Sequence, residues 1–318
     1  MKNYKLLNKL KNSKSVCLIS HINPDADAVA SMVVFKDFLK SKFNVDNIDL
    51  FAETKNNNEY LIPILKNEKL NPKPKKYDTA VMMDSPNLDR LGIYRNLFEH
   101  AEFKIVIDHH HTNNFDGEIN VVEPISSTCE IIYNILKLHK FPISKENKEN
   151  LYSGITTDTN NFTVGNFNSN TFKVISEIAD DINIPKLYEH FLGTNSLKTM
   201  QLLSVSINNL SLFESNKIII SHISKADSEK LEANDDDFAG IINKLATISN
   251  NVLVCLIYPK GNTYYVSMRS KQNYSVAEIA KKFGGGGHTG AAAFNSSLTI
   301  KQIKELILNE FKRILNKK

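Results

Sequence analysis

The chain has 318 residues, which is too long for one ordinary hydrophobic core and suits about two domains. With 42% hydrophobic and 23% charged residues, it has the composition of a globular protein and not of a disordered one. The net charge of +4 allows an anionic ligand but is too small for a protein that wraps duplex nucleic acid. No apolar run approaches the roughly 20 residues of a membrane span, so we expect a cytoplasmic protein without a membrane partner.

The first 180 residues alternate short apolar runs with helical patterns. Predicted strands cover residues 16–20, 48–51, 79–83 and 104–107, and predicted helices cover about 28–40, 126–139 and 145–157. Strands that alternate with helices in this way form parallel sheets covered by helices on both faces. The sequence therefore predicts an α/β fold class, with a doubly wound, mostly parallel sheet over residues 1–190.

Several predicted strands end in carboxylates or imidazoles. In a parallel sheet the carboxyl ends of the strands open onto the ligand crevice. For the fourth strand alone, a capped strand end with a surface histidine cluster explains the sequence equally well. Carboxylates or imidazoles also follow other predicted strands and end one predicted helix, and this repeated pattern favours a common site. The residues concerned are His21, Asp25, Asp27, Asp84, Asp108, His109, His110 and Asp158.

Such a set of side chains is sufficient to bind two divalent metal ions with shared ligands. Two adjacent metals activate water for in-line attack on phosphorus and neutralise charge on the phosphoryl oxygens. Because carboxylates are mixed with imidazoles, we expect manganese, with magnesium, cobalt or zinc as competitors. The pattern therefore predicts a two-metal phosphohydrolase.

The pattern changes in the second part of the chain. A long helix over 196–210 is predicted to lie within a linker, residues 191–213, before a smaller α+β domain over 214–318. In that domain we expect strands at 217–223, 251–258 and 263–269, and helices at about 236–246, 275–282 and 300–316.

A glycine run in this second domain is a candidate phosphate site. Four glycines, Gly284 to Gly287, precede His288, and the following Ala291 to Ala293 are predicted to form a helix. Successive N–H groups in such a run can form an anion nest, and His288 and Arg269 could add charge-assisted donors. A flexible loop is the alternative interpretation of the run.

Taken together, these motifs resemble those of the DHH phosphoesterase superfamily, in the branch with a C-terminal DHH-associated domain. HINPDADAVAS, VMMDS, IDHH and GITTDTNNF resemble its four metal-site motifs in order, and VSMRS and FGGGGHTGAAAF resemble the substrate loop of the C-terminal domain. Within that branch the chain resembles bacterial oligoribonucleases that degrade very short RNA and also dephosphorylate 3′-phosphoadenosine 5′-phosphate (pAp). One departure is Ala30, where the family usually has Gly.

The resemblance implies two Mn²⁺ ions in the active site, with Mg²⁺ or Co²⁺ as possible substitutes. His110 would be catalytic at the scissile phosphate, and Asp108 would orient the histidines. The implied metal ligands are His21 and Asp25 for one ion, Asp27, His109 and Asp158 for the other, and Asp84 as a bridge between them.

The resemblance also implies substrate contacts in both domains. Arg269 and His288 would act on the substrate, and Arg90 would contact a phosphate unless it is an ordinary surface arginine. The glycines implied in substrate binding are Gly284, Gly285, Gly286 and Gly287. Phe162 and Tyr274 are either base-stacking or core residues.

The function that follows is hydrolysis of RNA oligonucleotides of a few residues to 5′-mononucleotides and of pAp to AMP. A cyclic-di-AMP or pApA phosphodiesterase is the alternative, because it would use the same motifs. An inorganic pyrophosphatase or a non-catalytic nucleotide-binding regulator fits less well. The expected partners are short single-stranded RNA and pAp, with pApA and a homodimer as further possibilities.

Overall fold

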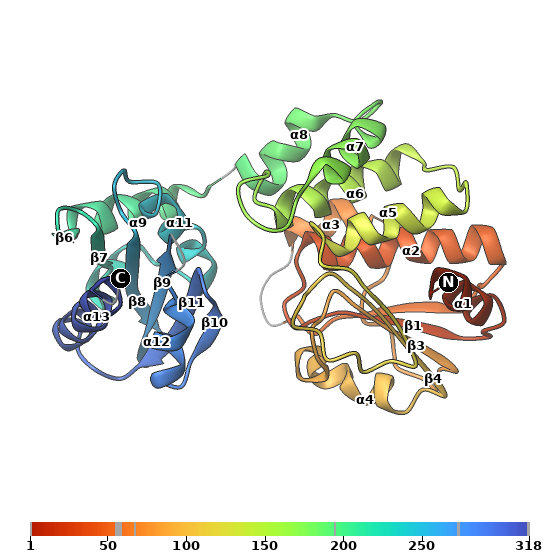
Figure 1. Cartoon of the computed structure of the whole chain (residues 1–318), viewed down its shortest axis with the longest axis horizontal. Coiled ribbons are helices and arrows are strands. Elements are labelled where there is room, and N and C mark those ends of the chain that lie inside the picture. Colours follow the sequence, from red (N-terminus) through yellow and green to blue (C-terminus); the bar gives the residue numbers. More distant parts are fainter. Residues whose placement is uncertain (1, 55–58, 67, 194, 272–273, 317–318) are drawn as a thin grey trace. The chain divides into compact units, whose positions relative to one another are not determined.

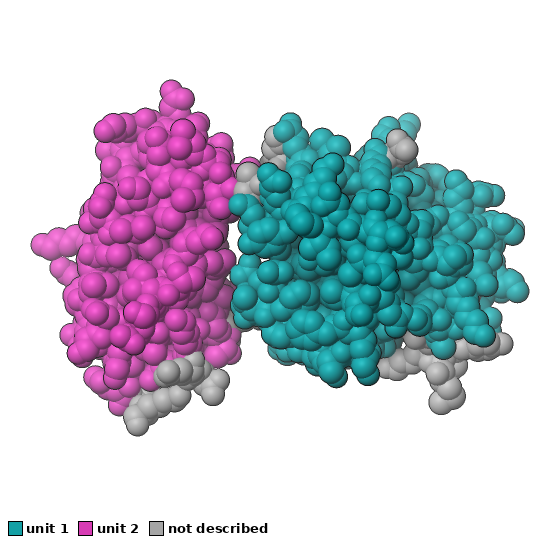
Figure 2. Space-filling model, turned by 90° about the horizontal axis from the view of Figure 1, so that it is seen from above, with its two compact units in different colours: residues 1–194 teal, residues 195–318 magenta. Residues whose placement is uncertain are grey.

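The computed structural model covers the 318-residue chain in two compact units, residues 1–194 and 195–318, which Figure 2 colours separately. It describes all residues except 1, 55–58, 67, 194, 272–273 and 317–318, and it does not describe the side chains of residues 2–5, 7 and 288. No helix in the described part of the chain is long and apolar enough to cross a membrane. Each unit is described by itself.

The first unit is built on a parallel sheet of five strands in the order β2-β1-β3-β4-β5. Helices α2, α5 and α6 lie on one face of the sheet and α4 on the other (Figure 1). The strands are β1 (Val16–Ile19), β2 (Ile48–Phe51), β3 (Thr79–Met83), β4 (Phe103–Asp108) and β5 (Ile119–Val122). The helices are α1 (Lys2–Lys11), α2 (Ala26–Phe43), η1 (Glu59–Leu61), α3 (Ile62–Leu65), η2 (Leu88–Tyr94), α4 (Arg95–Glu99), α5 (Thr128–Leu138), α6 (Lys145–Asp158), α7 (Ser169–Ile178), α8 (Ile184–Tyr188) and η3 (Glu189–Gly193).

The strands of this sheet are apolar because both of its faces are covered. Alternate residues of one strand point to opposite faces. Leu18 and Val81 belong to the core that includes α2 and α5, whereas Ile19 and Met82 belong to the core that includes Phe98 of α4. A continuous apolar run is therefore what a central strand of this sheet requires.

The second unit contains a mixed sheet of six strands in the order β10-β11-β9-β8-β7-β6. Strands β7 and β8 are parallel, and the other neighbouring pairs are antiparallel. The strands are β6 (Ser211–Phe213), β7 (Ile218–His222), β8 (Leu253–Lys260), β9 (Thr263–Ser270), β10 (Gly286–His288) and β11 (Ala291–Ser296). The helices are α9 (Leu197–Asn208), α10 (Lys225–Lys230), η4 (Asp235–Phe238), α11 (Ile241–Leu245), α12 (Val276–Lys282) and α13 (Ile300–Leu315).

The predicted fold class, a parallel α/β unit followed by a smaller α+β unit, is confirmed. The helix predicted near 196–210 is α9, which lies in the second unit with Leu202 buried against β7 and β8 residues such as Ile219 and Val254. One local prediction is wrong, because Ala291 to Ala293 form strand β11 and not a helix. Their small side chains suit a strand that pairs closely with the glycines of β10 on one side and with β9 on the other.

Candidate active site

The carboxyl ends of three neighbouring strands bring the predicted site residues of the first unit together. His21 follows β1, Asp84 follows β3, and His109 follows β4. These strands are adjacent and parallel in the sheet, so their carboxyl ends lie along one edge. Asp25 and Asp27 come from the start of α2, and Asp158 is the last residue of α6.

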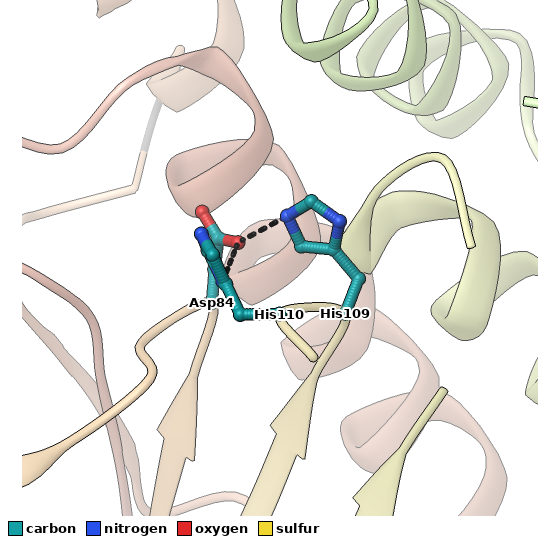
Figure 3. Close-up of side chains that lie close together, drawn as sticks. All are labelled: Asp84, His109 and His110. Atoms are coloured by element: carbon teal, nitrogen blue, oxygen red, sulfur yellow. Dashed lines mark ion pairs between the residues drawn. The ribbon is translucent and has the colours of Figure 1, made fainter. Parts of the chain in front are cut away.

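Asp84 contacts several imidazoles of this group, and Figure 3 shows it beside His109 and His110. Its Oδ1 is 3.4 Å from Nε2 of His109, and its Oδ2 is 3.6 Å from Nε2 of His21. The hydroxyl of Thr128 donates a hydrogen bond to Oδ1 at 3.0 Å. Asp84 is only 2% exposed and has a φ of 52°, in the left-handed region that side chains other than glycine adopt infrequently. The two oxygens of one fixed carboxylate therefore face two different imidazoles.

Asp27 is held by the start of another helix. Its Oδ2 accepts a hydrogen bond from the backbone N–H of Thr128 at 2.7 Å, and its Oδ1 accepts one from Cys129 at 2.8 Å. These N–H groups belong to the first turn of α5, where a helix offers unsatisfied donors and partial positive charge. The carboxylate is fully buried and fixed in orientation by a segment about a hundred residues away in the sequence.

Asp25 has a different local role. It is the N-cap of α2, and its Oδ1 accepts a hydrogen bond from the N–H of Ala28 at 3.0 Å. Its Oδ2 lies 3.8 Å from Nε2 of His21. The helix begins at Ala26, two residues earlier than predicted, because Asp25 and not Asp27 caps it. Ala30 is fully buried within this helix.

Burial and neighbouring charges change the pKa values of the group. Burial lowers the pKa of His109, but its hydrogen bond to Asp84 and the charges of the surrounding carboxylates together outweigh this and raise the pKa to about 11. The same balance raises the pKa of His21 to about 9. Burial tends to raise the pKa of Asp84, yet these two imidazoles hold it well below its usual value. Burial and the charge of Asp84 raise the pKa of Asp27 to about 7, and burial and Asp27 raise that of Asp158 to about 8. Ionised together, these carboxylates carry more charge than the imidazoles offset, which favours a bound cation.

The donor atoms fit metal ions. Among the described residues, three groups place their ligand atoms within 4.8 Å of one another: His21, Asp25 and Asp84; Asp27, His109 and Asp158; and Asp84, His109 and His110. Asp84 is common to the first and third groups, and its Oδ1 also lies near His109 of the second. Carboxylate oxygens combined with imidazole nitrogens suit divalent ions such as manganese, magnesium or zinc.

His110 is oriented by a buried carboxylate. Its Nδ1 lies 2.8 Å from Oδ1 of Asp108, which is fully buried, and 4.0 Å from Oδ1 of Asp84. The other oxygen of Asp108 accepts a hydrogen bond from Nδ2 of Asn113 at 2.7 Å. In Figure 3 the His110 ring lies beside Asp84, and its centroid is 4.4 Å from that of the His109 ring. Asp108 contacts His110, whereas Nδ1 of His109 faces the carbonyl of Ile125 at 3.2 Å.

Arg90 also lies at this sheet edge. One of its terminal nitrogens is 3.3 Å from Nδ1 of His21, and its carbonyl accepts a hydrogen bond from the N–H of Ile22 at 2.8 Å. Gly92, in the same segment, has a φ of 58°, and a Cβ there would lie 2.0 Å from Oε2 of Glu53 and 2.8 Å from Cγ1 of Ile22. The segment therefore packs tightly against the loop that carries His21.

Some of the predicted substrate residues of the second unit line a pocket of about 380 Å³. Gly286, Gly287 and Arg269 form part of its wall, together with Tyr258 and Tyr265. Burial lowers the pKa of Arg269, and its guanidinium donates to Oδ1 of Asn243 and to the carbonyl of Met268, both at 3.0 Å. Gly284 and Gly285 lie between α12 and β10. The predicted role of His288 concerns a side chain outside the described part of the structure.

Three residues that support the candidate site were not predicted from the sequence. Thr128 contacts both Asp84 and Asp27, and Asn113 holds Asp108. Gly154 allows α6 to approach this site, since a Cβ there would lie 2.4 Å from Sγ of Cys129 and 2.9 Å from Oδ1 of Asp27. The capping pattern at Ser127 predicts a helix that begins near Thr128, but it does not indicate that this helix start contacts Asp27 and Asp84.

Comparison with known families assigns both units. A model described as the DHH family, N-terminal domain, matches residues 15–155, and one described as the DHHA1 domain matches residues 215–317. The chain belongs to the DHH family. The resemblance inferred from the sequence motifs is thereby confirmed.

Relatives of this DHH protein match it over most of its length. A Streptococcus mutans protein named "Probable bifunctional oligoribonuclease and PAP phosphatase NrnA" is 26% identical, over 92% of each chain. A Thermus thermophilus protein named "Bifunctional oligoribonuclease and PAP phosphatase NrnA" is also 26% identical, over 95% of this chain and 90% of its own. An exopolyphosphatase-related protein from Bacteroides fragilis shares the fold, with a TM-score of 0.88 at 22% identity over 99% of this chain and 96% of its own. As a DHH protein, the chain is a metal-dependent phosphoester hydrolase.

Proposed function

We propose that this DHH protein hydrolyses RNA oligonucleotides of a few residues to 5′-mononucleotides and also converts pAp to AMP. The names of the relatives at 26% identity support this choice of substrates. The observation that carries the proposal is the position of Asp84, whose two oxygens face His21 and His109 in different donor groups. A shared carboxylate of this kind suits a pair of metal ions at a phosphate.

The proposed ligands divide into two sets around that carboxylate. His21 and Asp25 would hold one ion, and Asp27, His109 and Asp158 the other, with Asp84 between them. Two divalent ions at these positions would lower the pKa of a water molecule and neutralise charge on the phosphoryl oxygens. The mixed donors favour Mn²⁺, with Mg²⁺ or Co²⁺ as substitutes.

The chain's own residues would orient the substrate. His110, fixed through Nδ1 by Asp108, would present its other ring nitrogen to the scissile phosphate. Arg90, next to His21, would bind a phosphate oxygen. In the second unit, Arg269 and the glycines of the pocket, with His288, would bind a further phosphate or sugar of the substrate.

A substrate panel tests the proposal. Purified protein with Mn²⁺ should shorten an end-labelled RNA trimer to mononucleotides and release phosphate from pAp, and a chelator should abolish both reactions. If the trimer and pAp remain intact while pApA or cyclic di-AMP is cleaved, the substrate assignment is wrong and the alternative phosphodiesterase is correct. Hydrolysis of pyrophosphate alone would indicate a pyrophosphatase. The cytoplasmic location and the homodimer stay predictions.

A further inference from the structure

The loop that follows Asp158 carries an aromatic surface. Residues 159–168 connect α6 to α7. The ring centroid of Phe172, in the first turn of α7, lies 5.0 Å from that of Phe162 and 6.0 Å from that of Phe167. We call these three rings the aromatic ledge. Phe172 is 49% exposed, whereas Phe162 packs against the core.

The beginning of this loop is held in a defined conformation next to the metal-site residue Asp158. Thr159 is fully buried, its hydroxyl accepts a hydrogen bond from the N–H of Phe162 at 3.1 Å, and its carbonyl accepts two from Thr163 and Val164 at 3.0 Å. Phe162 has a φ of 61°, which is unusual for a bulky residue. Strain of this kind persists where the surroundings fix the backbone, and it gathers at functional sites.

The far end of the loop is held by Glu130, a buried carboxylate outside the proposed metal sets. Its oxygens accept hydrogen bonds from the hydroxyl of Thr171 and the amide of Asn170, both at 2.9 Å, and from the hydroxyl of Ser126. Glu130 lies in the first turn of α5, the same turn whose backbone binds Asp27. The loop is thus attached at one end to Asp158 and at the other to the helix start that organises the site.

The chemistry of the ledge suits a nucleobase. A half-exposed phenylalanine supported by two further rings offers an apolar, aromatic face to a ligand. Aromatic side chains next to a phosphate site are a common means of holding single-stranded nucleic acid, because every base has a π-face. The occupant we consider is therefore a base of the substrate, continuous with the phosphate at the metal site.

We propose that the aromatic ledge stacks, through Phe172, on a nucleobase of the short oligonucleotide hydrolysed at the adjacent metal site. This inference rests on the proposed function and adds a base-binding position to it. Glu130 acts as a positioning residue, because it holds the start of α7, which carries Phe172.

A fluorescence experiment tests binding without requiring turnover. The chain contains no tryptophan, so Phe172→Trp creates a single reporter on the ledge. Leu138→Trp is the matched control, because Leu138 is 62% exposed at the other end of α5. Diadenosine joined by a methylene-phosphonate should quench the tryptophan at 172 but not the one at 138. An unchanged signal at 172, with binding shown by calorimetry, would overturn the proposal.

Kinetics supply a second readout. Phe172→Ala should raise KM for an RNA dinucleotide about tenfold with little change in kcat, and Phe172→Tyr should restore it. Phe172→Ala should not change KM for a dinucleotide that lacks the stacked base. It should still raise KM for a dinucleotide that lacks only the other base. Equal KM values for wild type and Phe172→Ala would contradict the ledge. If the wild type hydrolyses neither RNA nor pAp, the proposed function fails, and the fluorescence result still decides whether the ledge binds a base.

Discussion

The two units build their candidate sites in opposite ways. In the first unit, charged and polar side chains converge at the carboxyl ends of parallel strands, and hydrogen bonds fix several of them. In the second, the pocket wall includes glycines and alanines of β10 and β11, with Arg269 as its charged side chain. The site of the first unit depends on its polar side chains, whereas the pocket of the second unit depends on several residues with little or no side chain. Substitutions should therefore affect the two sites by different mechanisms.

The largest effect is expected for the shared carboxylate. Asp84→Asn keeps the shape and the left-handed backbone but removes the charge between His21 and His109. We expect kcat/KM on an RNA trimer to fall on the order of a thousandfold or more, beyond the tenfold to hundredfold loss typical of residues that only orient a ligand. Mass spectrometry should also find less bound metal. Asp89→Asn, an exposed carboxylate paired with Arg95, is the control and should retain activity.

Metal binding should strengthen as the pH rises. Without metal, the pKa values of about 7 for Asp27 and about 8 for Asp158 leave both groups largely protonated at pH 6. A metal ion must displace these protons and also those on the imidazoles of His21 and His109, whose pKa values of about 9 and about 11 keep them protonated in this range. Apparent affinity for Mn²⁺ should therefore rise about tenfold per pH unit for each proton released between pH 6 and 8. Calorimetry in buffers of different ionisation enthalpy measures the protons released. An affinity independent of pH would contradict this arrangement.

The stability of the second unit should fall when a side chain is added at a tightly packed glycine. A Cβ at Gly285 would lie 2.1 Å from the carbonyl oxygen of Ala293, whereas one at Gly286 would meet nothing within 4 Å. We expect Gly285→Ala to destabilise this unit by about 2 kcal/mol, and the matched Gly286→Ala by less than about 0.5 kcal/mol. Urea unfolding followed by circular dichroism tests the difference. Bound metal should not change in either variant, because all the proposed metal ligands lie in the first unit, and a loss of metal would contradict that assignment.

The smallest effect concerns a neutral supporting group. Thr128→Val keeps the branched shape but removes the hydroxyl that donates to Asp84, and should weaken Mn²⁺ binding about tenfold. Thr128→Ser retains a hydroxyl and should bind nearly as well as the wild type. Isothermal titration with Mn²⁺ compares the two, and equal losses would indicate a packing effect and not a hydrogen bond.

The contrast between the units also explains what the sequence could predict. The strands that end at Asp84 and Asp108 were recognisable because apolar runs stop abruptly at charged residues. The contact between Asp27 and the start of α5 was not, since it joins segments about a hundred residues apart. Ala291 to Ala293 favour a helix locally, and only pairing with β9 and β10 makes them a strand. Likewise, the sequence suggested Phe162 as a base-stacking or core residue. In the structure Phe162 packs against the core, and Phe172 is the more exposed ring.

The proposed function requires that Asp84 be shared by two metal ions. Crystals soaked in Mn²⁺ and measured at the manganese absorption edge test it most directly. We expect two anomalous peaks about 3.5–4 Å apart, one on each side of the Asp84 carboxylate. A single peak, or two peaks that do not both contact Asp84, would contradict it.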